Sequence, residues 1–307
     1  MNVFEFLGLS PKHRPQGKVV QLVKNFDEVP ASKVSWPMYG QVKKDGVFGI
    51  LVVSPEGAAL FGRTGKRLMN CGYLEYAYEN LPYGCYLGEV CLPGQSLEVL
   101  SGIVNPNRTK PLEPGLEKVW QAGGEVHFFD HLTLLEFEQG ASSVKYTDRV
   151  ARAESLGLSF LKRYLILDEL EAEAFAQECV ARGEEGAVFK RDVDYLAGHK
   201  GWRAMKKVRS VSYDLECIGV EEGEGKYAGK VANLIFRWRD GETIKAMLGK
   251  GYTHEDAEIM LIASDRGSAS DPVGHIFRVY GLQDSSKGKI RLPKVGEPRY
   301  DKATPDY

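Results

Sequence analysis

The stretch around Lys43 constrains the fold of this chain more than any other part of its sequence. It reads Gln41-Val42-Lys43-Lys44-Asp45-Gly46 and continues into an apolar run at 47–53. An Asp-Gly pair between two strand-like segments predicts a strand, a tight turn and a second strand. Such a hairpin would hold the Lys43 amine at a fixed point, where a lysine can act as a nucleophile if burial or neighbouring cations favour its neutral form. The alternative is an ordinary surface hairpin, because Lys and Asp-Gly are common in turns.

The composition is that of a globular protein with balanced charge. The chain has 307 residues, with 40 Lys and Arg against 42 Asp and Glu, for a formal net charge of −2. A length of this order predicts two domains or one large one. The balanced charge gives no overall signature of nucleic-acid binding, so any nucleic-acid surface must be a local basic patch.

The sequence also bears on the compartment. Its apolar runs are too short to cross a bilayer, and its first residues lack the basic region of a secretory signal. The five cysteines are odd in number and no pair has C-x-x-C spacing, which argues against a disulfide scaffold or a structural zinc site. We therefore expect a cytoplasmic protein without membrane contact, whose cysteines are small core residues.

Residues 1–209 predict a mixture of strands and helices. Strands are expected at 86–92, 125–130, 184–190 and 202–209, and helices at 71–80 and 148–164. Asp168 followed by Glu171 predicts the N-cap of a further helix, which Gly183 would end. Residues 93–124 are rich in Gly, Pro and Asn and predict a long loop.

Charged residues in these segments are candidates for a functional site. Glu89 lies in an apolar strand, where a carboxylate is costly unless it is paired or bound to a metal. The alternative is that Glu89 faces solvent on the polar side of its strand. Arg63 and Lys66 belong to a basic turn, which fits either a phosphate contact or a solvated loop.

The pattern changes near residue 210. Short strands are expected at 215–220, 234–238, 243–247 and 275–280, separated by Gly-rich turns, and Thr253 with Asp256 predicts the cap of a short helix. Strands of this number and length suggest a small barrel of the OB type, a fold that commonly contacts nucleic acid. We therefore predict two domains, residues 1–209 and 210–307.

Taken in order, these motifs resemble those of the covalent nucleotidyltransferase superfamily, which contains ATP-dependent DNA ligases, RNA ligases and mRNA-capping enzymes. The matching segments of the first domain are Lys43-Lys44-Asp45-Gly46, Arg63-Thr64-Gly65-Lys66, Phe128-Phe129-Asp130, Glu185-Gly186-Ala187-Val188-Phe189-Lys190 and Lys206-Lys207. In the second domain, residues 222–230 and Arg299-Tyr300-Asp301-Lys302 are similar to the barrel entry and the R-x-D-K motif of ATP-dependent DNA ligases. The resemblance covers residues 37–302 and fits the small ligases of bacteriophages and some bacteria.

The resemblance implies an α+β fold. An adenylation (nucleotidyltransferase) domain of antiparallel sheets with flanking helices would be followed by a small OB-fold β-barrel. The implied activity is that of an ATP-dependent DNA ligase, which seals nicks in duplex DNA during replication, repair or recombination. It would form a Lys43–AMP intermediate, then a DNA-adenylate and finally the phosphodiester. The expected partner is nicked double-stranded DNA, and the expected state is a monomer.

The resemblance also implies roles for individual residues. Lys43 would be the catalytic nucleophile, and Mg²⁺, which Mn²⁺ could replace, would bind to Glu89 and Glu185. Phe129 would stack on adenine, and Gln41 would read the edge of the base. The full set of expected nucleotide contacts is Gln41, Val42, Lys43, Arg63, Phe129, Lys190, Lys206 and Lys207. On the barrel, the pyrophosphate that leaves would be oriented by Arg299, Asp301 and Lys302.

The sequence departs from the family pattern at two positions. Phe48 stands where the family usually has an arginine. Met205 stands at the first position of the K-x-K motif, so either Lys206 or Lys207 would contact the phosphate. An RNA ligase or a capping-type nucleotidyltransferase is an alternative, and a catalytically weak module that binds nicks is a second.

Overall fold

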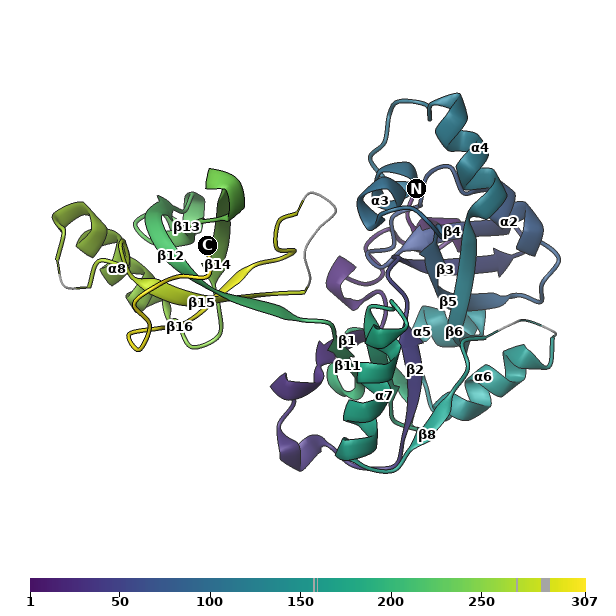
Figure 1. Ribbon diagram of the computed structural model, residues 1–307. Helices are drawn as coiled ribbons and strands as arrows, with labels where there is room; N and C mark the ends of the chain where they lie inside the picture. The colour runs from purple at the N-terminus through teal and green to yellow at the C-terminus, as the bar shows by residue number, and fades with distance from the viewer. Residues whose placement is uncertain (157, 159, 269, 283–287) are drawn as a thin grey trace. The chain divides into compact units, whose positions relative to one another are not determined.

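The chain folds into two compact units, Met1–Val208 and Arg209–Tyr307. The computed structural model describes residues 1–156, 158, 160–268, 270–282 and 288–307 (Figure 1). Each unit has its own hydrophobic core, so each is described by itself.

The first unit is built around two mainly antiparallel sheets. The first sheet contains, in spatial order, β1 (Leu22–Asn25), β11 (Lys200–Val208), β9 (Gly186–Lys190), β2 (Met38–Lys43) and β8 (Tyr164–Ile166). The second sheet contains, in spatial order, β4 (Gly57–Gly62), β3 (Val47–Ser54), β5 (Gly84–Cys91) and β6 (Glu125–Leu132). Within these sheets β1 and β11 pair in parallel, and the other neighbours pair in antiparallel.

The Lys-Lys-Asp-Gly turn connects the two sheets. Lys43 ends β2, which pairs with β8 and β9, whereas β3 pairs with β4 and β5. The predicted hairpin is therefore wrong, although both strands exist. A Cβ on Gly46 would lie 2.4 Å from the carbonyl oxygen of Val90, so the glycine is needed for the close approach of the turn to β5.

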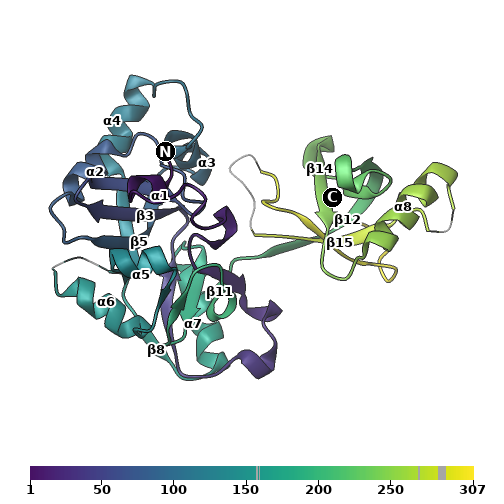
Figure 2. The ribbon, with the colours of Figure 1, turned by 180° about the vertical axis from the view of Figure 1, so that it is seen from behind.

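Helices cover the outer faces of the sheets. On the sheet of β2 and β11, α7 (Glu169–Ala181) packs Ala172 and Phe175 against Phe189 and Met205 (Figure 1). The reverse view shows α1 (Val3–Phe6) and α5 (Leu134–Gln139) against the sheet of β3 and β5 (Figure 2). The smaller elements of this unit are α2 (Gly72–Tyr78), α6 (Tyr146–Glu154), β7 (Ala141–Ser142) and β10 (Tyr195–Leu196).

Residues 93–124 are not the predicted long loop. They contain α3 (Leu97–Val104) and α4 (Pro114–Gly123). The Ser96 hydroxyl accepts a hydrogen bond from the Val99 N–H, and Pro114 occupies the first turn of α4, where a missing N–H is harmless. Trp120 of α4 is 1% exposed, so these helices complete the core on one face of the second sheet.

The predicted start of α7 is confirmed. The Asp168 carboxylate accepts a hydrogen bond from the Glu171 N–H, as an N-cap does. The predicted helix at 148–164 is too long: α6 ends at Glu154, and β8 begins at Tyr164. Residues 157 and 159 of that prediction lie outside the described residues.

The second unit is a closed barrel. Its strands follow in the order β12 (Val211–Glu222), β13 (Val231–Arg237), β14 (Thr243–Leu248), β16 (Lys294–Pro298) and β15 (Ile276–Gly281). The predicted cap of α8 (His254–Arg266) is confirmed, because Thr253 and Asp256 form a capping box. The sequence analysis missed β16, a short strand that contains Gly296 and Pro298. The predicted α+β class and the barrel are confirmed.

The cysteines are buried and unpaired. Those in the described residues are Cys71, Cys85, Cys91, Cys179 and Cys217. Within the described ranges, none of the helices has the length and apolar character needed to span a membrane.

Candidate functional site

Lys43 lies in an ion pair at the end of β2. Its Nζ is 2.5 Å from the Glu185 Oε2, and the Glu185 N–H donates to the Lys43 carbonyl oxygen at 3.2 Å. The two side chains are 17% and 11% exposed. The connection between the sheets thus places an amine and a carboxylate together in a partly enclosed position.

Strand register places further predicted residues on the same face of the sheet as Lys43. Directly paired residues of adjacent strands point to the same side. Lys43 pairs with Gly186 of β9, and Gln41 pairs with Val188, which in turn pairs with Lys206 of β11. Farther along, Tyr39 pairs with Lys190. This face therefore carries Lys43, Gln41, Lys206 and Lys190, although they come from three separate strands.

Of the two adjacent lysines of β11, Lys206 belongs to the Lys43 cluster. Burial lowers the pKa of Lys206, with Glu185 opposing and Lys43 adding to that effect, so its ammonium lies within electrostatic range of both. Lys207 is on the opposite face. Its Nζ is 2.9 Å from a carboxylate oxygen of Glu173 and 3.3 Å from one of Asp27.

The same alternation bears on two of the expected nucleotide contacts, Lys207 and Val42. Met205 is fully buried in the core beneath α7, so both Met205 and Lys207 of the aligned motif face away from Lys43. The predicted nucleotide contact of Lys207 is therefore not supported, because adjacent strand residues point to opposite faces. Val42 also packs its side chain into the α7 core, which leaves only its backbone for a nucleotide contact.

Glu89 comes from the second sheet and faces the same cluster. Burial raises the pKa of its carboxyl to about 7, with Lys43 opposing the shift and Glu185 adding to it. Among the described residues, its carboxylate has no hydrogen-bond partner. Arg63, on the exposed turn after β4, is within electrostatic range of both Glu89 and Lys206.

The donor set fits Mg²⁺ in one specific way. The described residues contain no group of three or more His, Cys, Asp and Glu side chains that could cage a metal. Mg²⁺ commonly binds through one or two carboxylates while substrate phosphates and waters complete its shell. Glu89 of β5, which has no hydrogen-bond partner among the described residues, and Glu185, directly before β9, match that requirement.

Lys190 lies at the other end of the shared face. Gly186, the partner of Lys43, is four residues away on β9, which corresponds to about 13 Å. The Lys190 Nζ donates to the Phe129 carbonyl oxygen at 3.0 Å and lies 4.3 Å from the centre of the Phe129 ring. Burial lowers its pKa to about 8. The structure thus brings Lys190 to Phe129, away from the Lys43 cluster.

Phe129 reaches this face through an irregularity in β6. The β5–β6 register shifts so that Gly88 pairs with Phe128 while Leu87 pairs with Asp130, which leaves Phe129 as the extra residue. Such bulges redirect a side chain. Phe48 contacts Phe129 edge to face, with ring centres 5.6 Å apart. An aromatic contact thus occupies the position at which the family usually has an arginine.

Gln41 carries an unused hydrogen-bond acceptor. The residue is 1% exposed, and its Nε2 donates to the Leu161 carbonyl oxygen at 2.9 Å. Among the residues that the structure describes, its buried Oε1 has no hydrogen-bond partner. Because a buried acceptor without a donor is costly, this atom marks a place where a ligand donor would be stabilised.

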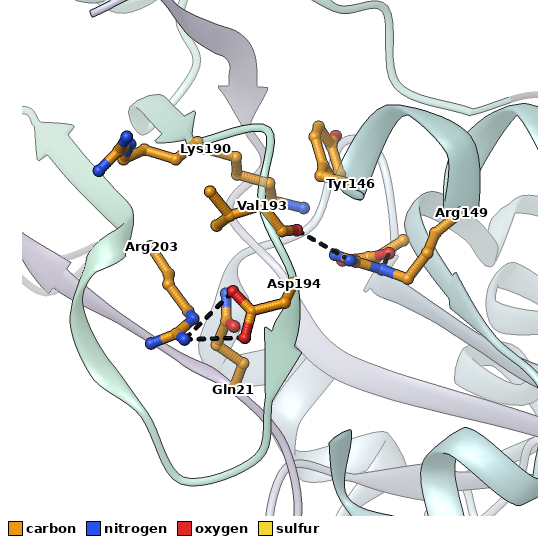
Figure 3. Close-up of a pocket in the computed structure, with 9 residues that line it drawn as sticks. Gln21, Tyr146, Arg149, Lys190, Val193, Asp194 and Arg203 are labelled. Carbon is orange, nitrogen blue, oxygen red and sulfur yellow. Dashed lines mark hydrogen bonds and ion pairs between the residues drawn. The ribbon is translucent and has the colours of Figure 1, made fainter. Parts of the chain in front are cut away.

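A polar pocket beside Lys190 contains residues that sequence reasoning missed (Figure 3). Arg149 is 1% exposed, and its Nε and Nη2 each donate to an Asp130 carboxylate oxygen at 2.9 Å. The Arg149 Nη1 donates to the Val193 carbonyl, while the Lys190 amine points toward Tyr146. A signal existed, because Arg149 falls on the apolar stripe of α6 with Tyr146, and a buried arginine requires a partner.

The predicted barrel motif forms its own charged cluster. Arg299 bonds to both Asp301 and the buried Asp214, and the Lys302 Nζ is 2.6 Å from the Asp214 Oδ2. Hydrogen bonds with Arg299 hold the pKa of Asp301 at about 2. These residues belong to the second unit and form a site of their own within it.

Several curated proteins of similar sequence are named "Probable DNA ligase". The chain is 40% identical over 87 residues to a protein named "Probable DNA ligase" from Anaeromyxobacter sp. (strain K), over 28% of this chain and 17% of that protein. It is 29% identical over 228 residues to another of that name from Kineococcus radiotolerans, over 70% of this chain and 42% of that protein. The chain thus matches less than half the length of these curated relatives. No family model matches it.

Solved structures share the fold of both units. A Lig E DNA ligase has a TM-score of 0.68 at 16% identity, covering 91% of this chain and 98% of that chain. The ATP-dependent DNA ligase of bacteriophage T7, in complex with ATP, has a TM-score of 0.55 at 16% identity, covering 92% and 99%. The chain is therefore a sequence relative of proteins named probable DNA ligase and has the fold of ATP-dependent DNA ligases, a nucleotidyltransferase domain followed by an OB-fold barrel.

Proposed function

We propose that the protein is an ATP-dependent DNA ligase that seals nicks in duplex DNA through a Lys43–AMP intermediate. The observation that carries the proposal is the convergence of Lys43, Glu185, Lys206 and Glu89 from both sheets of a ligase fold. The names of the similar structures add support, because one is a DNA ligase described as binding DNA with a minimal scaffold and another is a ligase in complex with ATP.

The first step is nucleophilic attack by Lys43 on the α-phosphorus of ATP. A bond forms between Nζ and phosphorus, the bond to the bridging oxygen breaks, and pyrophosphate leaves with that electron pair. Lys43 must lose its proton and its ion pair with Glu185 before the attack. Lys206 stabilises charge on the α-phosphate. Mg²⁺ held by Glu89 and Glu185 would further neutralise the phosphates.

The far end of the face fits adenine. The unpartnered Gln41 Oε1 would accept a hydrogen bond from the 6-amino group of the base, and the Lys190 amine supplies a donor nearby. Guanine presents an acceptor where adenine presents the amino group, so it would oppose the Gln41 oxygen. Phe129 offers its ring for stacking on the base. This arrangement favours ATP over GTP and so disfavours a capping-type enzyme.

The later steps transfer AMP to the 5′-phosphate of a nick and then join the 3′-hydroxyl with release of AMP. Arg63 would contact a phosphate beside the cluster, and its electrostatic effect on Glu89 and Lys206 supports that role. Arg299, Asp301 and Lys302 would act on pyrophosphate in the first step. We expect a monomer that works on nicked DNA in the cytoplasm during replication, repair or recombination, with Mn²⁺ able to replace Mg²⁺.

Labelled ATP tests the nucleophile. With Mg²⁺, the protein should form a covalent adenylate, and Lys43→Ala should abolish it. Lys44→Ala is the matched control, because Lys44 is the neighbouring lysine and pairs with a different carboxylate, Glu184. Labelling that persists in Lys43→Ala would show that the nucleophile is another residue.

A sealing assay separates the alternatives. Nicked duplexes with all-DNA strands should be sealed faster than duplexes that contain RNA strands. Faster sealing of RNA would favour an RNA ligase, and labelling by GTP would favour a capping-type enzyme. A protein that binds nicked DNA and forms no adenylate would be a nick-binding module.

A further inference from the structure

A buried carboxylate of the barrel gathers the charged groups of the R-x-D-K motif. Asp214 of β12 has a side chain that is 6% exposed. Its oxygens accept hydrogen bonds from the Arg299 Nη1 at 2.8 and 3.0 Å. The Lys302 Nζ is 2.6 Å away and the Arg278 Nε is 3.1 Å away. Cations from β15 and from the segment after β16 thus converge on one carboxylate of β12.

Backbone hydrogen bonds fix Asp214 itself. Its N–H donates to the Asp306 Oδ2 at 2.8 Å, and the Asp306 N–H donates to the Asp214 carbonyl oxygen at 2.8 Å. The other Asp306 oxygen lies 3.5 Å from the Lys302 Nζ. Lys302 is therefore held between two carboxylates, one within the barrel and one on the segment that follows the motif.

The arrangement holds the long side chains of Arg299 and Lys302 in fixed positions before an anion binds. Asp214 lies against Arg299, Lys302 and Arg278, whereas the other carboxylates that pair with these cations, Asp301, Asp306 and Glu297, are more exposed. An oxyanion would therefore compete with the exposed carboxylates for the cations, while the buried Asp214 keeps the cations in place. Asp301, which also bonds to Arg299, is 67% exposed, so Asp214 alone anchors Arg299 from the buried side. Groups fixed before the reaction stabilise developing charge more effectively than mobile ones.

We propose that Asp214 is a positioning residue, whose buried carboxylate sets the geometry from which Arg299 and Lys302 act on the pyrophosphate of ATP. The inference rests on the proposed ligase function. Pyrophosphate leaves only while Lys43 is being adenylated. Asp214 therefore contributes to that step and not to the joining of a nick that already carries AMP.

Asp214→Asn tests this division, because the amide keeps the shape of the side chain and removes its charge. The rate of labelled adenylate formation from ATP and Mg²⁺ should fall tenfold or more. Sealing of a nick supplied with AMP already on its 5′-phosphate, without ATP, should stay within twofold of the unmodified protein. Glu216→Gln is the matched control, since Glu216 lies on β12 and its carboxylate pairs with Arg237 at 2.9 Å. In Glu216→Gln, the rates of adenylation and of sealing should both stay within twofold of those of the unmodified protein.

Two outcomes with Asp214→Asn would overturn the inference. Equal losses in adenylation and in sealing would show that Asp214 only maintains the barrel, and unchanged adenylation would show that its charge is not needed. If thermal unfolding shows that Asp214→Asn does not fold, Asp306→Asn takes its place. That variant should show a smaller but still selective loss of adenylation, and an unselective loss would overturn the inference. The proposed function fails separately, if the unmodified protein forms no adenylate.

Discussion

Replacing Arg149 with methionine should destabilise the first unit by about 3–5 kcal/mol. Arg149 is the partner of the Asp130 carboxylate in a buried pair whose side chains are 2% and 5% exposed. Removing one member of such a pair leaves an uncompensated buried charge, which costs about 3–5 kcal/mol. After the change, Asp130 would keep the hydrogen bond that it accepts from the His131 N–H at 2.8 Å.

The local structure explains why this loss lies at the upper end for single substitutions. Arg149 also donates to the carbonyl oxygens of Val144 and Val193, so methionine would leave two backbone acceptors without that donor. Changing Asp130 to leucine as well removes the buried charge. The double variant should therefore recover roughly 1–2 kcal/mol relative to Arg149→Met alone.

Native-state hydrogen exchange, read by mass spectrometry, measures the opening free energy of each unit separately. The opening free energy of peptides from β6 and α6 should fall by the expected amount, while that of barrel peptides should not change and serves as the internal control. A loss below about 1 kcal/mol in Arg149→Met would refute the reasoning. So would a double variant that is less stable than Arg149→Met, because the penalty would then not come from the unpaired charge.

Two further predictions concern the site, and a third concerns the acid stability of the first unit. Lys206→Ala should lower the rate of adenylation at least tenfold, whereas Lys207→Ala should change it less than threefold; adenylate labelling measures both, and the reverse order would contradict the register argument. Gln41→Leu should reduce labelling by ATP about tenfold and should bring the labelling rates with ATP and GTP closer together. An unchanged ratio of the ATP rate to the GTP rate would count against a contact between Gln41 and the base. The Glu136 carboxyl has a pKa of about 2, below its usual value of 4.5. Burial raises this pKa, but hydrogen bonds and the charge of Arg152 outweigh the effect of burial. Glu136 therefore stabilises the fold above pH 4.5 and loses this contribution as the pH falls toward 2, so urea unfolding of Glu136→Gln should show a flatter acid dependence.

Local signals in the sequence were sufficient for several elements. Asp168 and Thr253 cap helices through contacts three residues away, so their roles could be read directly. The loop predicted at 93–124 is wrong because the prediction rests on the Gly and Pro content of the segment, whereas Ser96 and Pro114 start helices there. The composition of a segment averages over all its residues, so it does not reveal a single residue that favours the start of a helix.

Pairings between distant segments could not be read from the sequence. The face to which Lys206 points depends on its register against Val188, and nothing near either residue encodes that register. Asp214 and Arg299 are 85 positions apart, so the R-x-D-K motif predicts a role for Arg299 but does not indicate that Asp214 is its hydrogen-bond partner. The Lys-Lys-Asp-Gly motif predicts Lys43 as the candidate nucleophile, but the carboxylates that lie around it depend on how the two sheets pack.

The Lys-Lys-Asp-Gly connection has a consequence for how substrate binding affects the fold. Glu185 borders the sheet of β2, while Glu89 belongs to the sheet of β3, so the two expected metal ligands stand on opposite sides of this connection. A nucleotide with its metal ion would join the sheets through contacts to both. Any movement that parts the sheets would then have to release the ligand first, so binding should stiffen the whole first unit.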